Sequence, residues 1–432
     1  MEEFESKSNL LESFMKSTSS TSSSLNPTQA EEKEKEKPTS LLDTVDQMED
    51  DAFFEETNYA LPSNVRMEEE GLKVDTTDEI YGGRYVQRDQ TIETVESFED
   101  GIEVITLGNA LKKYDWFREK YFWKALSRDK NDMTRAVAQN DETNPTGYVI
   151  IAHPGARSVN PVNGQLIMES SHMQYVHNIL IAMPGSQLTV ASFCSYHCPS
   201  QQASDSIVLR GVQRAIVFLD GTVRSNSLIS IHSWCHAFAV WPVSAAIVDD
   251  NGVFYSNYVC LEPVQRVKMC PVANLRGKNA VANFSSVLLA KEGTDLDIGS
   301  CALLNGEGSR SESITRTISK GGTVFARADI HGNAPNTKGH IECQGLVITE
   351  GKGMIYSIPQ ISGGFGTELS HEAAIGKIAK DKIEYLMTRR MTEETAVSVI
   401  IRGFLNVKVK GIPRSVQEQM DAVIEQASKE GF

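Results

Sequence analysis

Short apolar, β-branched runs separated by turn residues dominate the middle of the chain. The runs are Tyr148–Ala152, Ile179–Ile181, Ile207–Phe218, Leu228–Ile231, Ala245–Val248, Val253–Tyr258, Leu288–Ala290 and Leu346–Thr349. No amphipathic stretch of about a dozen residues, as a βαβ crossover needs, separates them. Residues 147–366 are therefore predicted to form a mainly β core, either a sandwich, a barrel or a parallel β-helix. Irregular turn lengths and few Asn-Gly pairs favour the β-helix slightly over hairpin architectures.

Helical periodicity flanks this core on both sides. On the N-terminal side, Leu111, Tyr114, Phe117 and Tyr121 recur at spacings of three and four and form one apolar stripe, so we expect a helical region over 46–146. On the C-terminal side, a helical region is predicted over 367–432. It contains a short helix around Ile383, a longer helix capped by Thr392, and an amphipathic segment over 415–429.

The N-terminus and the overall charge narrow the class of protein. Residues 1–45 combine a Ser/Thr run with a Glu/Lys block, which predicts a disordered polar tail. The chain has a net charge of -15, and an acidic surface makes nucleic-acid binding an unexpected main role. No run approaches the ~20 apolar residues of a membrane helix, and the acidic start lacks a secretory signal. We expect a soluble, cytoplasmic protein.

The seven cysteines lie between residues 194 and 343. An odd number, spread widely over a long chain, argues against a disulfide framework and for a reducing compartment. Each is then a buried apolar residue, a nucleophile or a metal ligand. The stretch 345–352 has a spacing close to a phosphate-binding loop, but its glycines are too far apart and Gly353 stands where Ser or Thr is needed. Any nucleotide therefore has to be supplied by a partner.

Several motifs in the C-terminal third are similar to those of one family. These motifs are Lys338-Gly-His-Ile-Glu-Cys343, Glu368-Leu-Ser-His-Glu-Ala-Ala-Ile-Gly-Lys-Ile378, Tyr385-Leu-Met-Thr-Arg389, Thr392-Glu-Glu394 and Ile401-Arg-Gly-Phe404. Lys113-Tyr-Asp-Trp116 and Val176-His-Asn178 extend the similarity upstream. The chain resembles the SufB/SufD family over about 100–430, and most closely the shorter archaeal SufB-like proteins.

The resemblance implies a right-handed parallel β-helix with helical flanks. It also implies a non-enzymatic scaffold on which a transient iron–sulfur cluster, [4Fe-4S] or [2Fe-2S], is assembled for apoprotein acceptors. The partner it implies is the ABC-type ATPase SufC, bound by a homodimer in a two-plus-two complex. SufC docking falls on the C-terminal helices, and we assign Tyr385, Leu386, Ile400, Ile401 and Phe404 to that surface.

Cys343 is the first ligand that the resemblance implies, followed by Glu372 and His371. A mixed Cys, His and carboxylate set suits a transient cluster, because the harder ligands exchange more readily. Adjacent residues on a strand point to opposite faces, so His371 and Glu372 do not easily bind one ion from the same chain. His371 otherwise caps the first C-terminal helix. Ser370 replaces a glutamate typical of SufB, which removes one carboxylate.

Cys194 and Cys198 compete for the position of the family's sulfur-accepting cysteine. With His197 they also have a spacing compatible with a metal clip. Cys235, Cys260, Cys270 and Cys301 are predicted to be core residues, with Cys235 set apart by its neighbours His232 and His236.

Two alternatives remain open. One is a SufD-like structural partner without a cluster of its own, against which the joint presence of Cys343 and Glu372 argues. The other is a β-helix carbohydrate lyase or esterase, which needs acidic and basic side chains along a groove. The Asp249/Asp250 and Asp295/Asp297 pairs have no evident basic partner in the sequence, so turns are their expected location.

Overall fold

The computed structural model describes residues 67–68, 71–72, 81–168, 175–196, 209–219, 226–233, 238–261, 263–348 and 352–405. The chain separates into two units, 1–58 and 59–432, and all described residues belong to the second. The predicted polar tail over 1–45 and the amphipathic segment over 415–429 lie outside the described residues. No helix among those described is long and apolar enough to cross a membrane.

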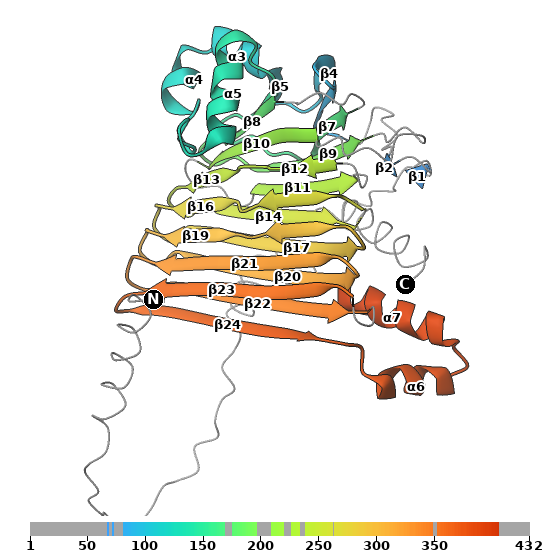
Figure 1. Cartoon of the computed structure of the whole chain (residues 1–432). Helices are drawn as coiled ribbons and strands as arrows, with labels where there is room; N and C mark the ends of the chain where they lie inside the picture. The colour runs from blue at the N-terminus through green and yellow to red at the C-terminus, as the bar shows by residue number, and fades with distance from the viewer. Residues whose placement is uncertain are drawn as a thin grey trace, which may run out of the picture. The chain divides into compact units, whose positions relative to one another are not determined.

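Two long sheets stack strand upon strand to form a parallel β-helix (Figure 1). The first sheet has the spatial order β24 (Thr367–Gly376), β22 (Thr337–Val347), β20 (Arg310–Lys320), β17 (Val281–Lys291), β14 (Val253–Cys260), β11 (Asn226–Ser233), β9 (Leu188–Tyr196), β7 (Val162–Met168), β3 (Gly83–Arg88) and β4 (Thr91–Ser97). All neighbours in this order pair in parallel except β3 and β4. The predicted β-helix is confirmed, and the sandwich and the barrel are excluded.

The second sheet faces the first and is split along part of its length. Its order is β12 (Phe238–Val240), β15 (Arg266–Met269), β18 (Asp295–Ile298), β21 (Thr323–Gly332), β19 (Cys301–Leu304), β16 (Val272–Leu275), β13 (Ala245–Val248), β10 (Leu209–Leu219), β8 (Tyr175–Ala182), β6 (Tyr148–Ala152) and β5 (Ile102–Thr106), with β23 (Met354–Gly363) paired to β21. The long strands β10 and β21 each pair with two short strands, because bends interrupt the coils between them.

Alternating burial explains why these sequences form coils. Along β21 and β22 every second residue is buried, so one face of each strand fills the interior and the other faces outward. At one corner, residues with a left-handed backbone recur every 28 to 30 positions: Asn251, Asn279, Gly308, Asn336 and Gly366. Asn and Gly tolerate this conformation best, so they set the turn that starts each new coil.

The two ends of the β-helix differ. At the N-terminal end, antiparallel strands β4 and β5 flank the sheets, and α3 (Leu107–Lys113), α4 (Asp115–Lys120) and α5 (Asp132–Thr143) pack on the second sheet. At the C-terminal end, β24 and β23 are the last strands of their sheets in the described chain. There α6 (Lys380–Thr388) and α7 (Glu393–Leu405) project beside the final coil (Figure 1).

The structure corrects the secondary structure predicted for both flanks. The region 46–146 is not wholly helical, because β3, β4 and β5 precede α3, and β1 (Met67–Glu68) pairs with β2 (Gly71–Leu72). The region 367–432 begins with ten residues of strand β24. The segment is a strand because it pairs in parallel with β22 over ten residues. The cap at Thr392 is confirmed, since its hydroxyl accepts from the Thr395 amide at 3.2 Å.

Candidate functional site

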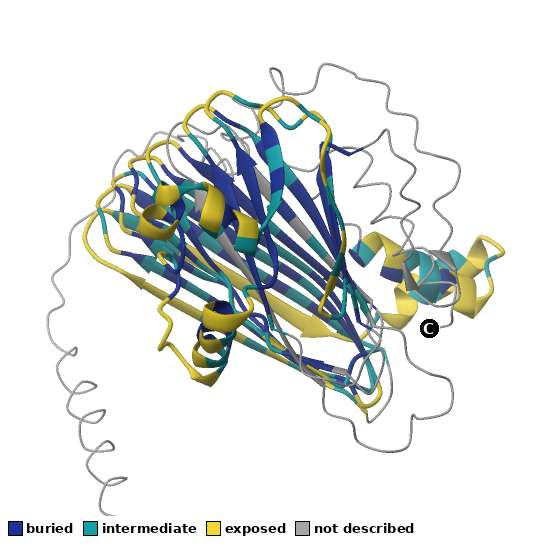
Figure 2. Ribbon diagram, turned by 90° about the horizontal axis from the view of Figure 1, so that it is seen from above, coloured by how far each residue is buried: buried dark blue, intermediate teal, exposed yellow. Residues whose placement is uncertain are grey.

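Two of the motifs lie on the last two strands of the first sheet, 338–343 on β22 and 368–376 on β24, at the end where the β-helix is least covered. Figure 2 shows buried strands enclosed by exposed turns and helices. Most residues of β23 and β24, which make up the final coil, are exposed, above all toward the end of each strand. Six of the ten exposed large apolar residues among the described positions lie on this coil. They are Met354, Tyr356, Ile358, Ile361, Phe365 and Ile375. An uncovered coil with this composition is suited to contact another macromolecule.

Cys343 lies on β22 with its side chain toward the interior and is 4% exposed. Its register neighbours are Thr315 on β20 and Ala373 on β24. Burial raises the pKa of the thiol, while the nearby Ser357 hydroxyl and Arg316 charge lower it somewhat. Ala373 is the only residue of β24 in register with Cys343. Because its side chain is a single methyl group, little separates Cys343 from the C-terminal end of the β-helix.

His371 and Glu372 lie on opposite faces of β24. His371 is in register with the buried Ile341, whereas Glu372 is in register with Glu342. Side chains in register share a face in a parallel pair. His371 therefore has the same facing as Cys343, and Glu372 the opposite facing. The reading of His371 as a helix cap is wrong, because the first C-terminal helix begins nine residues later, at Lys380.

The outer face beside Glu372 holds a polar network that sequence reasoning missed. The Glu342 carboxylate accepts hydrogen bonds from Arg316 and from Gln344, both at 2.7 Å. Arg316 and Glu342 are 15% and 19% exposed, so their ion pair is largely screened from water. Ser370, the replacement for a family glutamate, lies 2.9 Å from Nδ1 of His340. The sequence did carry a signal for this network. Glu342 stands next to Cys343 in the motif, so on a strand its side chain faces the opposite side from the thiol.

Cys194 is distant from this group. It lies on β9, 1% exposed, and packs with Leu166, Tyr258 and Cys260. Five strand steps separate β9 from β22, or about 24 Å at ~4.8 Å per step. Cys194 and Cys343 of one chain therefore cannot bind the same ion. Cys198 and His197 lie outside the described residues, so the predicted clip stays a prediction.

The other cysteines differ in exposure. Cys260 is buried as predicted, and Cys235 lies outside the described residues. The core prediction is wrong for Cys270, which is exposed at the bend between β15 and β16, while Cys301 is half-buried. Partial burial together with the Asp329 charge raises the pKa of Cys270 to about 11, and burial with the Cys270 thiol raises that of Cys301 to about 12. Both are therefore neutral thiols near pH 7.

The aspartate pairs have basic partners on an adjacent coil, contrary to the reading of the sequence. Asp249 pairs with Arg276, with Nη2 to Oδ2 at 2.8 Å. Asp295 pairs with Arg266 at 3.0 Å, and Asp297 pairs with Arg327 at 2.5 Å. These partners lie 27 to 30 residues away in sequence, which is one coil. The pairs neutralise charge between stacked coils.

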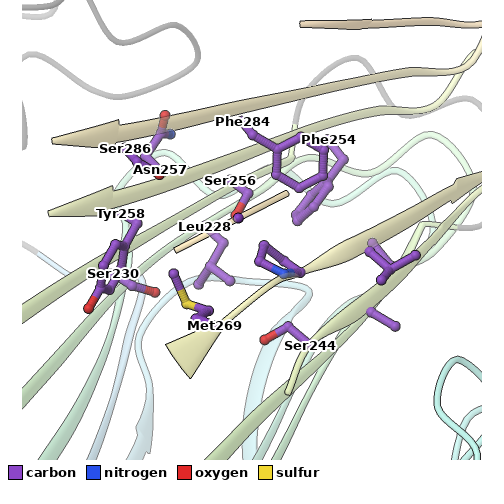
Figure 3. A pocket seen from close by; sticks show the side chains of 15 residues that line it. Leu228, Ser230, Ser244, Phe254, Ser256, Asn257, Tyr258, Met269, Phe284 and Ser286 are labelled. Carbon is purple, nitrogen blue, oxygen red and sulfur yellow. The ribbon is translucent and has the colours of Figure 1, made fainter. Parts of the chain in front are cut away.

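A small cavity lies between the two sheets (Figure 3). Its volume is about 40 Å³, and its lining includes Leu228, Ser256, Tyr258, Met269 and Phe284. This volume suits a few water molecules and is far below the ~300–1,000 Å³ of a typical ligand pocket.

The docking residues divide into exposed and buried sets. Tyr385 is 59% exposed on α6, and Leu386 and Ile400 are half-buried. Ile401 is fully buried and packs with Phe404 against the strand residues Val287 and Ile318. In this structure Ile401 holds α7 on the β-helix, and α6 presents the open surface.

Within the described residues, no group of three or more His, Cys, Asp or Glu side chains is assembled to hold a metal ion. Among these residues Cys343 and His371 share one face of the sheet, but they are not part of such a group.

Comparisons with known proteins point to one family. The family described as "SUF system FeS cluster assembly, SufBD core domain" matches residues 165–404. An "Iron-sulfur cluster assembly SufBD family protein" of Archaeoglobus fulgidus is 42% identical over 369 residues, covering 84% of this chain and 95% of the relative. One of Methanothermobacter thermautotrophicus is 32% identical, covering 82% and 86%. One of Staphylococcus aureus is 24% identical, covering 76% and 69%.

Proposed function

The chain belongs to the SufB/SufD family of iron–sulfur cluster assembly proteins, and we propose that it is the scaffold on which a transient cluster is built. The scaffold itself catalyses no reaction. It works in the cytoplasm with a SufC-type ATPase and passes the cluster, [4Fe-4S] or [2Fe-2S], to apoproteins. The observation that carries this proposal is that Cys343 on β22 and His371 on β24 share one face of the sheet at the least covered end of the β-helix.

Cys343 is the primary iron ligand in this proposal. Its neutral thiol must lose a proton to bind, so iron binding releases a proton and strengthens with rising pH. His371 is the nearest candidate on the same face. Glu372 reaches an ion only at the free edge of β24, where side chains from both faces can approach. Such a mixed set exchanges more readily than four buried thiolates.

A second copy of the chain completes the site. Among the described strands, β23 pairs only with β21 and β24 only with β22, and an edge left open in this way favours pairing with another strand. The six exposed apolar residues of the final coil supply surface for burial, and Phe365 is fully exposed at the turn between β23 and β24. An isologous contact at this coil brings two copies of Cys343 and His371 toward one axis.

The ATPase docks on α6 in this proposal. Tyr385 and Met387 are 59% and 43% exposed, and no residue of α6 is buried in the chain. Ile401 and Leu405 anchor α7 on the β-helix, so α6 has a fixed support. The docking surface is therefore Tyr385, Leu386 and Met387, with Ile401 acting indirectly.

Anaerobic reconstitution tests the scaffold role. The purified chain is incubated with ferrous iron, sulfide and the ATPase, then passed through gel filtration without chelator. We expect visible absorption of a cluster in the wild type and its loss in Cys343→Ala. Cys270→Ser is the matched control, since Cys270 is exposed and lies at a bend between two strands of the other sheet. A colourless wild type refutes the scaffold role, and a coloured Cys343→Ala refutes the ligand assignment.

A SufD-like structural partner is the second candidate. It is favoured by Ser370, which leaves one carboxylate fewer at the coil, and by the outward facing of Glu372. It predicts the same dimer without bound iron, so the reconstitution experiment separates the two. The lyase alternative gains no support, because Asp295 and Asp297 are each ion-paired with an arginine and the cavity of about 40 Å³ is too small for a sugar.

A further inference from the structure

The helices α3, α4 and α5 and the residues between them form a helical cap at the N-terminal end of the β-helix. This cap carries a basic surface, although the protein as a whole is acidic. Residues 112–130 contain seven basic and three acidic side chains, while the whole chain has a net charge of -15. Lys112, Arg118, Lys120, Lys124 and Lys130 are all exposed. Figure 1 shows this cap, with α3, α4 and α5, at the opposite end of the β-helix from α6. The proposed cluster site and ATPase site do not use it.

Two arginines of this surface are positioned by the same aromatic ring. The guanidinium carbons of Arg118 and Arg128 lie 5.4 and 5.6 Å from the centroid of Phe122. The ring itself is fixed, since it is 5% exposed and stacks on His177 at 5.5 Å. Cation–π contacts of this kind reduce the freedom of both side chains. The two guanidinium groups are therefore held within about 11 Å of each other, so neighbouring carboxylates of one acidic segment can reach both.

Within the described chain, acidic side chains neutralise the charges of Arg118 and Arg128 only weakly. Arg128 has Glu142 at 3.8 Å, with exposed fractions of 43% and 70%, and such exposed pairs contribute little. For Arg118 no ion pair is found with any residue in the described ranges. By contrast, the neighbouring Lys113 is bound to Glu103 at 2.8 Å. The guanidinium forks of Arg118 and Arg128 remain available to bind a carboxylate in bidentate geometry.

The surroundings favour an acidic polypeptide over a nucleic acid. Single-stranded nucleic acids use exposed aromatic platforms for base stacking. Here Phe117, Tyr121, Phe122 and Trp123 are all buried. The acidic chain as a whole also repels a long polyanion, whereas a short acidic segment contacts only the cap.

We propose that Arg118 and Arg128, flanked by Lys120 and Lys124, form a docking site for an acidic segment of a partner protein. Carboxylates bind the two guanidinium groups, and the lysines steer the approach. This interaction is separate from the ATPase and dimer contacts at the other end, and it does not depend on the proposed function.

The test measures binding of a labelled 14-residue peptide of alternating Glu and Ala to the full-length chain by fluorescence anisotropy. We expect the double variant R118Q/R128Q to weaken binding by about tenfold or more, the loss expected from two charge-assisted contacts. The variant R118K/R128K keeps the positive charges but loses the guanidinium forks, so its peptide affinity should fall between that of the wild type and that of R118Q/R128Q. R389Q is the matched control, because Arg389 also lies over a ring, 5.3 Å from Tyr385, on the distant helix α6.

Further arms identify the ligand. Thermal unfolding confirms that each variant is folded, since both arginines pack on Phe122. A labelled 14-nucleotide single-stranded DNA and inorganic phosphate serve as competing probes. Equal peptide binding by wild type and R118Q/R128Q, unchanged binding by R118K/R128K, or tighter binding of DNA than of peptide at equal salt overturns the proposal.

Discussion

Cys343 and His371 lie on the neighbouring strands β22 and β24 and face the same side of the sheet, with His371 in register with Ile341, two residues before Cys343. Glu372 faces the other side, in register with Glu342. His371 and Glu372, which are adjacent in sequence, therefore lie on opposite faces of the sheet. Cys343 and His371, which are about one coil apart in sequence, share a face. This relationship ranks the proposed ligands in an order that can be tested.

Replacing His371 should reduce cluster binding more than replacing Glu372. His371→Ala removes a donor on the face of Cys343, whereas Glu372→Gln changes a group at the strand edge. If Glu372 only supports the site, its loss lowers iron affinity by about 10–100-fold or less. Iron and sulfide content after anaerobic reconstitution measures both variants. Ser370→Ala, on the outer face, is the control, and a stronger effect of Glu372→Gln would contradict this ranking.

Introducing a charge at Phe365 should dissociate the proposed dimer. Phe365 is fully exposed in the chain, so Phe365→Asp costs the folded monomer little, yet it places a carboxylate in an apolar contact. Sedimentation velocity should show a shift from dimer to monomer with an unchanged melting temperature. The matched control is Phe98→Asp, because Phe98 is also an exposed phenylalanine, 43% accessible, away from the final coil. A dimer that persists in Phe365→Asp argues against this interface.

Thiol alkylation should distinguish the cysteines by burial and by pH. Cys270 is exposed with a pKa raised to about 11, so only a small fraction is thiolate at pH 7.5, and its rate should rise about tenfold per pH unit up to about pH 10. Cys343 also has a raised pKa and is buried, so it should react later than Cys270. Mass spectrometry of peptides after timed treatment with iodoacetamide measures both. Faster modification of Cys343 at neutral pH would show that the coil opens.

The buried pair of Asp141 and His177 should stabilise the helical cap on the β-helix. Nδ1 of His177 lies 2.6 Å from the Asp141 carboxylate, which also accepts from Trp123 at 2.9 Å. Both side chains are nearly inaccessible, at 0% and 2% exposure. His177→Ala leaves the carboxylate with one donor fewer in a dry site, which should cost about 3–5 kcal/mol of unfolding free energy.

Chemical denaturation monitored by tryptophan fluorescence measures this loss. His153→Ala is the control, because His153 lies 3.1 Å from Glu103 but is 37% exposed, so its pair should contribute about 1 kcal/mol or less. Similar losses in the two variants would mean that burial adds nothing to the pair between Asp141 and His177.

The sequence by itself determined the class of fold and the family. Short β-branched runs and turn residues require strands without crossover helices, and the C-terminal motifs carry the family resemblance. Local alternation also fixed that His371 and Glu372 diverge. The boundary at 367 was out of reach, because β24 is a strand only through pairing with β22, a contact formed across a whole coil.

Only the tertiary structure decided which residues meet. The coil of 28 to 30 residues sets every register, so it pairs Arg276 with Asp249, brings Arg316 to Glu342 and exposes Cys270 at a bend. It also shows that Ile401 is buried while Tyr385 is exposed, although both lie in the C-terminal motifs. Such contacts depend on the length of each coil, which is set by the spacing of successive corner turns and is not visible in any short stretch of the sequence.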